Sequence, residues 1–273
     1  MEPLITGRAL VSDIDSYDPP TGSVAFWWLG QNGFVLKGAG CVLYIDAYLA
    51  PDQSRRTPPL VHPSRVTHAD AFLGTHDHSD HVDRVSLPGL MQASAQAKLV
   101  VSKVTAGALV RDGYDAARVV GISEGDWVQV GAARIGAIRA AHEFLDMSAD
   151  LGYPHLGFVI QLNGATIYHA GDGVPWEGLR AAVAACRPDA VFVPINGRDA
   201  ARYRSGCIGN FTFQEAVDLV GEVRPRLAVP MHYDMFAGNS EQVDRFTDYL
   251  DAKYPGIPWW VGSPGERGLV QSA

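Results

Sequence analysis

The chain has 273 residues and a formal net charge of −8. Hydrophobic residues make up 47% and charged residues 19%, so the chain has enough apolar side chains for a sizeable core and does not have the composition of a disordered protein. The acidic balance argues against a general nucleic-acid-binding protein, because that function needs a basic surface.

Cysteine content and the N-terminus predict where the protein works. Three widely spaced cysteines, Cys41, Cys186 and Cys207, do not form the pattern of a disulfide framework. Residues 1–4 have neither the basic start nor the apolar stretch of a signal peptide, and no apolar run is long enough to cross a membrane. We expect a cytoplasmic protein with no membrane and no nucleic-acid partner.

Hairpins and β/α units alternate along the chain. Residues 1–22 are polar and end in a turn signal. The predicted strands are 23–29, 34–37, 41–45, 71–74, 98–102, 119–122, 127–130, 133–140, 157–162, 165–169, 190–193, 227–229 and 257–261. The predicted helices are 87–96, 105–112, 176–185, 212–223 and 240–254. This order predicts one α/β domain over residues 1–273, built of two similar halves as a four-layer αββα sandwich.

A run of three histidines and two aspartates follows the predicted strand 71–74. Imidazole nitrogens and carboxylate oxygens are ligands that suit Zn²⁺, Mn²⁺ or Fe²⁺. His76 and His78 are two residues apart, so in an extended segment they leave the same face. The adjacent Asp80 and His81 must diverge, which suits ligands of a second ion. Because clustered histidines and a desolvated carboxylate both need compensation, the run predicts a site for one or two divalent metal ions.

Three further candidate ligands, His142, Asp172 and His232, lie just beyond predicted strands. A site at one edge of a sheet needs side chains at strand ends. His155 competes with His142, but it precedes its strand, and we expect it at the opposite edge; the choice between the two stays open. Asp46 ends the strand 41–45 and is predicted to orient a ligand histidine or the ligand run from behind, with a turn cap as the alternative.

The loop 196–210 is basic. It carries Arg198, Arg202 and Arg204 against one acid, Asp199. Arginine binds phosphate or carboxylate through paired hydrogen bonds. We predict that Arg198 recognises an anionic group on a small-molecule substrate; a solvated loop or a subunit contact is the alternative.

The ordered set of candidate ligands resembles the metallo-β-lactamase superfamily over most of the chain. The His-x-His-x-Asp-His element is its most specific part, with Asp46 before it and three ligands after it. The resemblance implies the αββα fold. It also implies that one metal is bound by His76, His78 and His142, that the other is bound by Asp80, His81 and His232, and that Asp172 bridges them.

Four further segments resemble the L-ascorbate-phosphate lactonase branch of that superfamily: 28–34, 195–199, 207–210 and 230–236. This resemblance implies a divalent metal such as manganese, opening of a sugar-acid lactone by hydroxide formed at the metal, and a homo-oligomer. Asp80 and Asp172 are then the expected catalytic residues. The expected substrate-binding residues are Arg198, Asn196, Asn210 and Tyr233.

Other functions fit the same ligand set. A metal-dependent phosphodiesterase on this fold is the first alternative, a di-iron redox protein the second, and a non-catalytic metal-stabilised module the third. The long, proline-rich segment 47–70 is predicted to be a lid or a contact surface.

Overall fold

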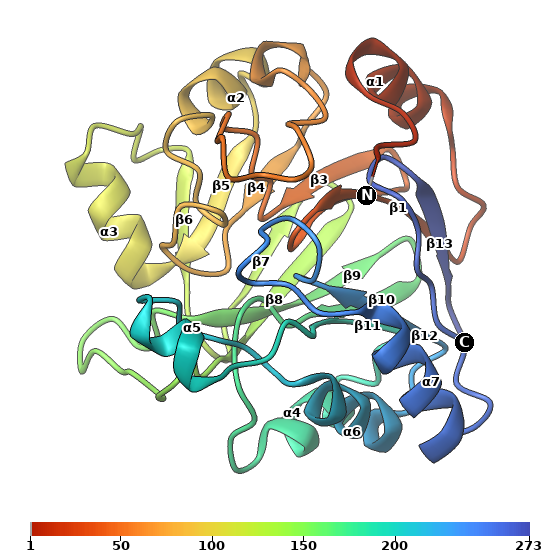
Figure 1. Cartoon of the computed structure of the whole chain (residues 1–273). Coiled ribbons are helices and arrows are strands. Elements are labelled where there is room, and N and C mark those ends of the chain that lie inside the picture. Colours follow the sequence, from red (N-terminus) through yellow and green to blue (C-terminus); the bar gives the residue numbers. More distant parts are fainter. Residues whose placement is uncertain (1) are drawn as a thin grey trace.

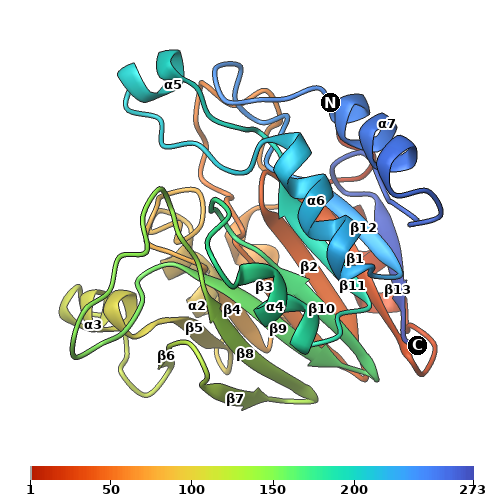
Figure 2. The ribbon, with the colours of Figure 1, turned by 90° about the horizontal axis from the view of Figure 1, so that it is seen from below.

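The computed structural model describes residues 2–273 of the chain; Met1 lies outside the described residues. Two sheets lie face to face between two layers of helices, as Figure 1 shows. The first layer consists of α1 (Gly7–Ser16), α2 (Leu87–Ala93) and α3 (Lys103–Arg111). The second consists of α4 (Leu179–Ala185), α6 (Phe213–Val223) and α7 (Val243–Lys253), seen from below in Figure 2. This arrangement confirms the predicted four-layer sandwich.

The first sheet has seven strands in the order β13-β1-β2-β3-β4-β5-β6. Their bounds are β1 Ser23–Gly30, β2 Gly33–Gly38, β3 Cys41–Ile45, β4 Ala71–Leu73, β5 Lys98–Ser102, β6 Val119–Ile122 and β13 Arg267–Gln271. Neighbours are antiparallel from β13 to β3 and parallel from β3 to β6. The strands β3 and β4 therefore end side by side, and the segments that follow them start at one edge.

The second sheet has six strands in the order β12-β11-β10-β9-β8-β7. Their bounds are β7 Trp127–Val130, β8 Ala133–Arg139, β9 Leu156–Leu162, β10 Ala165–His169, β11 Ala190–Pro194 and β12 Leu227–Met231. The pairs from β7 to β10 are antiparallel, and those from β10 to β12 are parallel. Consequently β8, β10 and β12 run in one direction and end at the same edge of the sheet.

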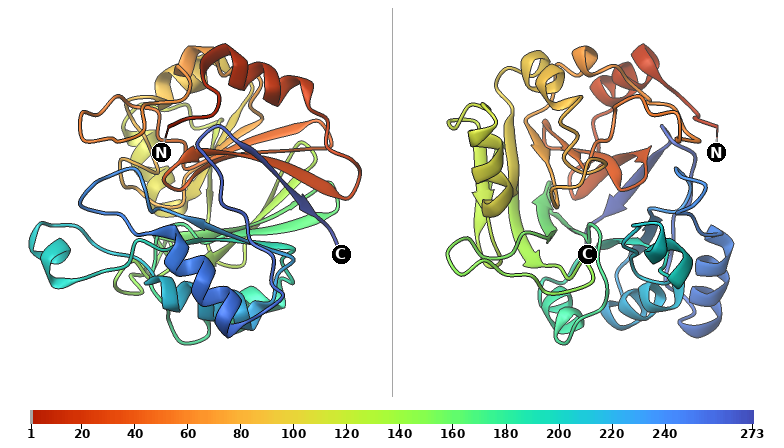
Figure 3. Two further views of the ribbon diagram at one scale, coloured as in Figure 1. Left: turned by 45° about the vertical axis from the view of Figure 1, so that its right-hand side comes forward. Right: turned by 60° about the vertical axis from the view of Figure 1, so that its left-hand side comes forward.

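Strand β1 shows how one segment serves two cores. Val24, Phe26 and Trp28 pack between the two sheets, while the alternate residues Ala25 and Trp27 pack beneath the first helix layer. All eight residues of β1 are buried. Because both faces of the strand are covered, it is apolar throughout rather than alternating in polarity. The two views of Figure 3 show the helix layers on either side of the paired sheets.

The two ends of the chain differ from the prediction. The expected strand 257–261 is wrong: Trp259 makes only an isolated bridge with Ala228, and the last strand is β13, which pairs with β1. Helix α1 was not predicted, because Leu10 and Ile14 are its only buried residues. The five-residue helix α5 (Ala200–Arg204) was missed for the same lack of an apolar face. Among residues 2–273 no helix combines the length and apolarity that crossing a membrane requires.

Asp83 ties the early loop, residues 47–70, to the segment that carries the candidate ligands. One carboxylate oxygen accepts the backbone N–H groups of Leu49 at 2.9 Å and Ala50 at 2.7 Å. The other accepts those of Val85 at 3.0 Å and Ser86 at 3.1 Å. The side chain is buried, so water cannot replace these bonds.

We predict that Asp83→Ala lowers the free energy of unfolding by about 3 kcal/mol, because buried N–H groups lose their acceptor. Urea unfolding followed by circular dichroism measures the change. Asp115→Ala is the matched control, since Asp115 accepts the N–H of Ala117 at an exposed position. Equal losses in the two variants would contradict this role of Asp83.

Candidate metal centre

The ligand loop, residues 75–81, leaves the end of β4 and turns back on itself. The turn is closed by the N–H groups of His81 and Val82, which donate to the His78 carbonyl at 3.1 and 2.8 Å. Gly74 permits this path, because a Cβ atom there would lie only 2.5 Å from a methyl carbon of Val82. The turn therefore brings both ends of the loop to the same edge of the sheet.

The structure brings all seven predicted ligands into one cluster. Three groups each have their ligand atoms within 4.8 Å of one another. These groups are His76, His78 and His142; His76, His81 and Asp172; and Asp80, His81 and His232. The first and third groups correspond to the two metal sites that the superfamily resemblance implies.

Asp172 lies between the two groups. Its Oδ1 is 3.5 Å from His81 Nε2, and its Oδ2 is 3.4 Å from His232 Nε2. The same Oδ2 is 3.8 Å from Nε2 of His142, which belongs to the first group. A carboxylate that reaches both groups is placed as a bridging ligand would be.

The cluster fits divalent metal ions by the state of its donor atoms. Within the described residues, Nε2 of His76 and Nε2 of His81 are buried and have no hydrogen-bond partner. Leaving such an atom without a partner costs about 1–3 kcal/mol. A cation at the centre of the cluster would bind both atoms, and a donor set of imidazoles and carboxylates suits Zn²⁺, Mn²⁺ or Fe²⁺.

At His142, His76 and Asp172, burial or neighbouring charge favours the protonation state that metal binding requires. Burial lowers the pKa of His142 to about 4, although the charge of Asp172 opposes the change. Burial also holds the pKa of His76 well below its usual value, and the neighbouring His81 adds to the effect. Burial alone would raise the pKa of Asp172, but His232 and His81 outweigh it and hold this pKa well below its ordinary value. Neutral imidazoles and an ionised carboxylate are the forms that bind metal. Burial alone would lower the pKa values of His81 and His232, but the charge of Asp172 outweighs it and raises both, so metal binding at these two residues releases protons.

Asp46 supports the cluster from behind, in the position predicted for it. Its Oδ2 accepts a hydrogen bond from His81 Nδ1 at 2.7 Å and one from the Thr75 hydroxyl at 2.8 Å. Its Oδ1 accepts the Thr75 N–H at 2.9 Å. When His81 is neutral and donates from Nδ1 to this carboxylate, its other ring nitrogen is free of a proton and faces the cluster.

Two amide side chains of segment 28–34 that were not among the predicted site residues also reach the cluster. Gln31 and Asn32 form the turn between β1 and β2. The Asn32 amide donates to Asp172 Oδ1 at 2.7 Å, and the Gln31 amide donates to Asp80 Oδ2 at 3.1 Å. The Gln31 amide nitrogen is also 3.1 Å from His232 Nε2. In the sequence, this role is indicated only indirectly, by two adjacent amide residues in the turn between two apolar strands.

The expected position of His155 is wrong. Its ring centroid lies 5.4 Å from those of both His76 and His142, at the edge that carries the cluster. Strands β8 and β9 are antiparallel, and Arg139 pairs with Leu156. The start of β9 therefore lies beside the end of β8. In the described part of the chain His155 belongs to none of the three ligand groups, so the structure favours His142.

Asn196 and Asn210 form a buried amide chain next to the segment that follows Asp172. The Asn210 amide donates to Asn196 Oδ1 at 3.1 Å, and Asn210 Oδ1 accepts the Gly173 N–H at 2.9 Å. The Asn196 amide in turn donates to Asn239 Oδ1 at 2.7 Å. These contacts position the backbone beside Asp172, and substrate binding by either asparagine stays a prediction.

Arg198 already has an anionic partner. Its guanidinium donates to both carboxylate oxygens of Glu215, at 2.6 and 2.7 Å, and to the Asn210 carbonyl at 3.1 Å. Glu215 is also the capping-box residue of α6, so the pair joins the loop to that helix. These bonds leave the Nε–H group of Arg198 for a substrate anion, while Glu215 already offsets the charge of the guanidinium.

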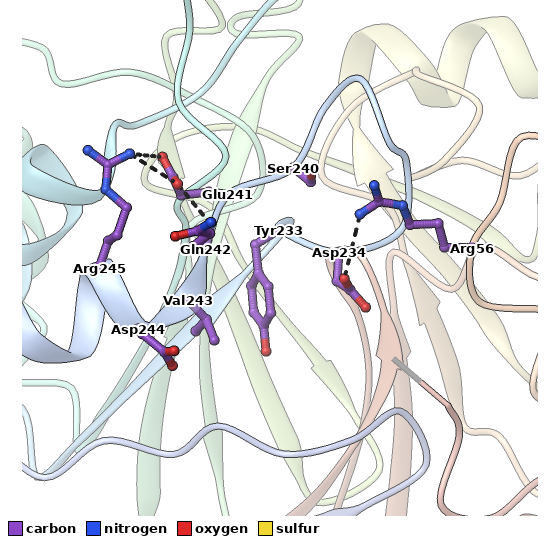
Figure 4. Close-up of a pocket in the computed structure, with 9 residues that line it drawn as sticks. All are labelled: Arg56, Tyr233, Asp234, Ser240, Glu241, Gln242, Val243, Asp244 and Arg245. Carbon is purple, nitrogen blue, oxygen red and sulfur yellow. Dashed lines mark hydrogen bonds and ion pairs between the residues drawn. The ribbon is translucent and has the colours of Figure 1, made fainter.

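Tyr233 lines a surface cavity of about 850 Å³, drawn in Figure 4. It is buried, and its ring stacks on Trp28 with centroids 5.1 Å apart. The cavity wall carries charges of both signs, including a pair between Arg245 and Glu241 at 3.2 Å. The seven candidate ligands do not line this cavity, although Tyr233 directly follows the ligand His232 in the chain, and substrate binding by Tyr233 stays a prediction.

Comparison with known proteins identifies the family. Residues 42–233 match the family described as "Beta-lactamase superfamily domain", and the chain belongs to this superfamily. A UPF0173 protein of Pyrococcus abyssi is 30% identical over 218 residues, which cover 79% of this chain and 86% of that protein.

Further similarities agree with a metal-dependent hydrolase of this fold. A UPF0173 metal-dependent hydrolase of Archaeoglobus fulgidus is 27% identical over 250 residues, covering 88% of this chain and 96% of that protein. The solved structure of Igni18, a metallo hydrolase of Ignicoccus hospitalis, aligns with a TM-score of 0.73 at 21% identity. That alignment covers 92% of this chain and all of the other.

We predict that removing the metal lowers thermal stability. A ligand that binds only the folded state at 1,000 times its dissociation constant stabilises by about 4 kcal/mol, or about 10 °C for a chain of this size. Differential scanning fluorimetry with and without a chelator measures the shift, and added Mn²⁺ or Zn²⁺ should restore it. An unchanged melting temperature in a protein shown to be metal-loaded would contradict the site.

We also predict that Gln31→Met and Asn32→Leu each weaken metal binding about 10- to 100-fold, because hydrogen bonds that hold ligand side chains contribute on this scale. Competition with a metallochromic chelator measures the affinity without any substrate. Gln129→Met is the matched control, since the exposed Gln129 amide donates only to the Gly131 carbonyl. If both turn variants bind metal as tightly as Gln129→Met does, the turn does not hold the ligand side chains in place.

Proposed function

We propose that this metal-dependent hydrolase opens the rings of lactones. The observation that carries the proposal is a cluster able to hold two ions beside an arginine that is committed to Glu215. Divalent ions can bind the anionic oxygen of a phosphodiester by themselves, but the arginine that would add a further contact to the phosphate is paired with Glu215. A lactone carbonyl is neutral and needs only polarisation at the metal. The pairing of Arg198 therefore favours the lactone over the phosphodiester.

The residues that would hold the ions are the three histidines of the first group and Asp80, His81 and His232 of the other, with Asp172 between them. When bound, divalent ions polarise a carbonyl oxygen and lower the pKa of water. Asp46 orients His81, and Asn32 orients Asp172, through the hydrogen bonds described above. These supports keep the ligand atoms in place without reorganisation during the reaction.

Asp80 and Asp172 are proposed to accept the proton of the attacking water. The Asp172 side chain is 6% exposed, and that of Asp80 is 21% exposed. Asp80 can therefore exchange a proton with solvent, while Asp172 holds the cluster together. Hydrogen bonds from Gln31 to Asp80 and from Asn32 to Asp172 fix the orientation of the two carboxylates.

The anionic substrate group stays a prediction. If Arg198 binds it, Arg198→Ala should raise KM for an anionic lactone and leave KM for a neutral lactone unchanged. If Arg198 acts only through Glu215, the variant should affect both substrates equally. The bidentate pair with Glu215 favours the second result.

We predict that protein reloaded with Mn²⁺ or Zn²⁺ hydrolyses simple lactones with a kcat/KM about a hundredfold above that for bis-p-nitrophenyl phosphate. A pH-indicator assay measures ring opening, and p-nitrophenol release measures the phosphodiester. Chelator-treated protein is the control. Faster cleavage of the phosphodiester would replace the lactonase proposal with the phosphodiesterase alternative.

A further inference from the structure

A smaller cavity of about 220 Å³ is lined in part by residues that closely follow two candidate ligands in the chain. Glu143 and Val174 line one side of it. Glu143 directly follows the candidate ligand His142, and Val174 lies two residues after Asp172. The Val174 N–H donates to the Ala141 carbonyl at 2.7 Å, which holds these two segments together. The cavity wall is thus a direct continuation of two ligand segments.

The loop 198–209 forms the other side of the cavity. The hydrogen bond from the Gly173 N–H to Asn210 joins the end of this loop to the Asp172 segment. Burial raises the pKa of the Cys207 thiol, Arg202 opposes the rise, and the charges of Asp172 and Asp80 add to it. The thiol on this wall is therefore within electrostatic reach of both acids of the metal centre.

The wall of the cavity has mixed polarity, and two of its three charged side chains already have partners. Val174, Tyr203, Cys207 and Ile208 contribute apolar or weakly polar side chains. The arginine on the wall is paired with Glu215, as described above. Asp199, the residue before α5, caps the N-terminus of that helix. Its carboxylate accepts two backbone N–H groups, at 2.8 and 3.0 Å. The remaining charge is the negative one of Glu143, which disfavours an anionic ligand.

Exposed apolar side chains are concentrated in the two loops that contribute Glu143 and residues 199–209 to the cavity wall. Of the eleven large hydrophobic residues that are exposed in residues 2–273, six belong to the mouth loops, which we define as residues 143–152 and 199–209. Phe144 is 67% exposed, Met147 63% and Tyr203 63%. Clustered exposure of this kind marks a binding surface, because single exposed apolar residues are normally scattered.

We propose that this cavity binds the uncharged aliphatic substituent of the substrate, while the lactone ring lies at the metal centre. The inference rests on the proposed lactonase function and adds a substrate class to it, namely lactones with an alkyl side chain. A dry cavity of 150 Å³ accommodates benzene, so 220 Å³ corresponds to about six to eight carbon atoms. Val174, Tyr203 and Ile208 are then the residues that determine specificity.

A series of γ-lactones with side chains of zero to ten carbons tests the proposal on the metal-loaded full chain. Burial of each methylene is expected to raise kcat/KM about three- to fourfold until the cavity is filled. The gain should stop near six to eight carbons. A γ-lactone that carries a carboxylate at the end of its side chain should be a poorer substrate than the uncharged lactone of equal length.

Ile208→Asp should flatten the series, because it introduces a charge into the cavity. Val110→Asp on α3 is the matched control: Ile208 is 38% exposed and Val110 is 42% exposed, so both changes add a carboxylate at a similar surface position. The control should retain the wild-type dependence on chain length.

γ-Lactams with the same side chains separate the two proposals, because their dissociation constants are measured by calorimetry without turnover. Lactam affinity that rises with side-chain length in the wild type, and does not rise in Ile208→Asp, supports the cavity proposal. If no lactone is hydrolysed, the lactonase proposal is overturned, but this support for the cavity remains. Lactone turnover and lactam affinity that are both independent of side-chain length would overturn the cavity proposal alone. A preference for the carboxylated lactone would also overturn it.

Discussion

The buried carboxylate of Asp46 is the contact on which the metal centre depends. It is fully buried, and it accepts hydrogen bonds from the backbone and hydroxyl of Thr75 and from His81. A buried anion that loses its partners costs about 3–5 kcal/mol, so this carboxylate keeps the ligand loop in one conformation. Its own backbone has φ of +44°, a conformation that most residues avoid. The fold maintains this strain where the first sheet meets the cluster.

The centre joins the two sheets. The ligand loop comes from the first sheet, whereas His142, Asp172 and His232 follow strands of the second. The turn at Gln31 and Asn32, which belongs to the first sheet, contacts His232 and Asp172 of the second through its two amides. A change in the distance between the sheets would therefore separate the two halves of the ligand set. Close packing of Phe26, Phe34 and Phe192 between the sheets keeps that distance constant.

The floor and the mouth of the site differ in construction. The floor consists of side chains at strand ends, most of them buried, and hydrogen bonds from neighbouring groups hold Asp80, His81 and Asp172 in place. The mouth consists of loops that carry exposed apolar residues such as Phe144 and Tyr203. This division allows the chemistry at the metal to stay constant while the loops select the substrate, because loops change without disturbing a sheet edge. The pocket proposed for the aliphatic substituent is lined by these loops.

Much of the site could be predicted from the sequence, since metal ligands are specific residue types at recognisable positions beyond apolar strands. The run from His76 to His81 and the outlying His142, Asp172 and His232 are of this kind, as is the sandwich that follows from hairpins alternating with β/α units. Only the tertiary structure decided the rest. The edge occupied by His155, the pairing of β13 with β1, the amide contacts of Gln31 and Asn32 and the commitment of Arg198 to Glu215 all depend on residues far apart in sequence. Local pattern carries no information about which distant side chains become neighbours, and that proximity is set by packing of the whole chain.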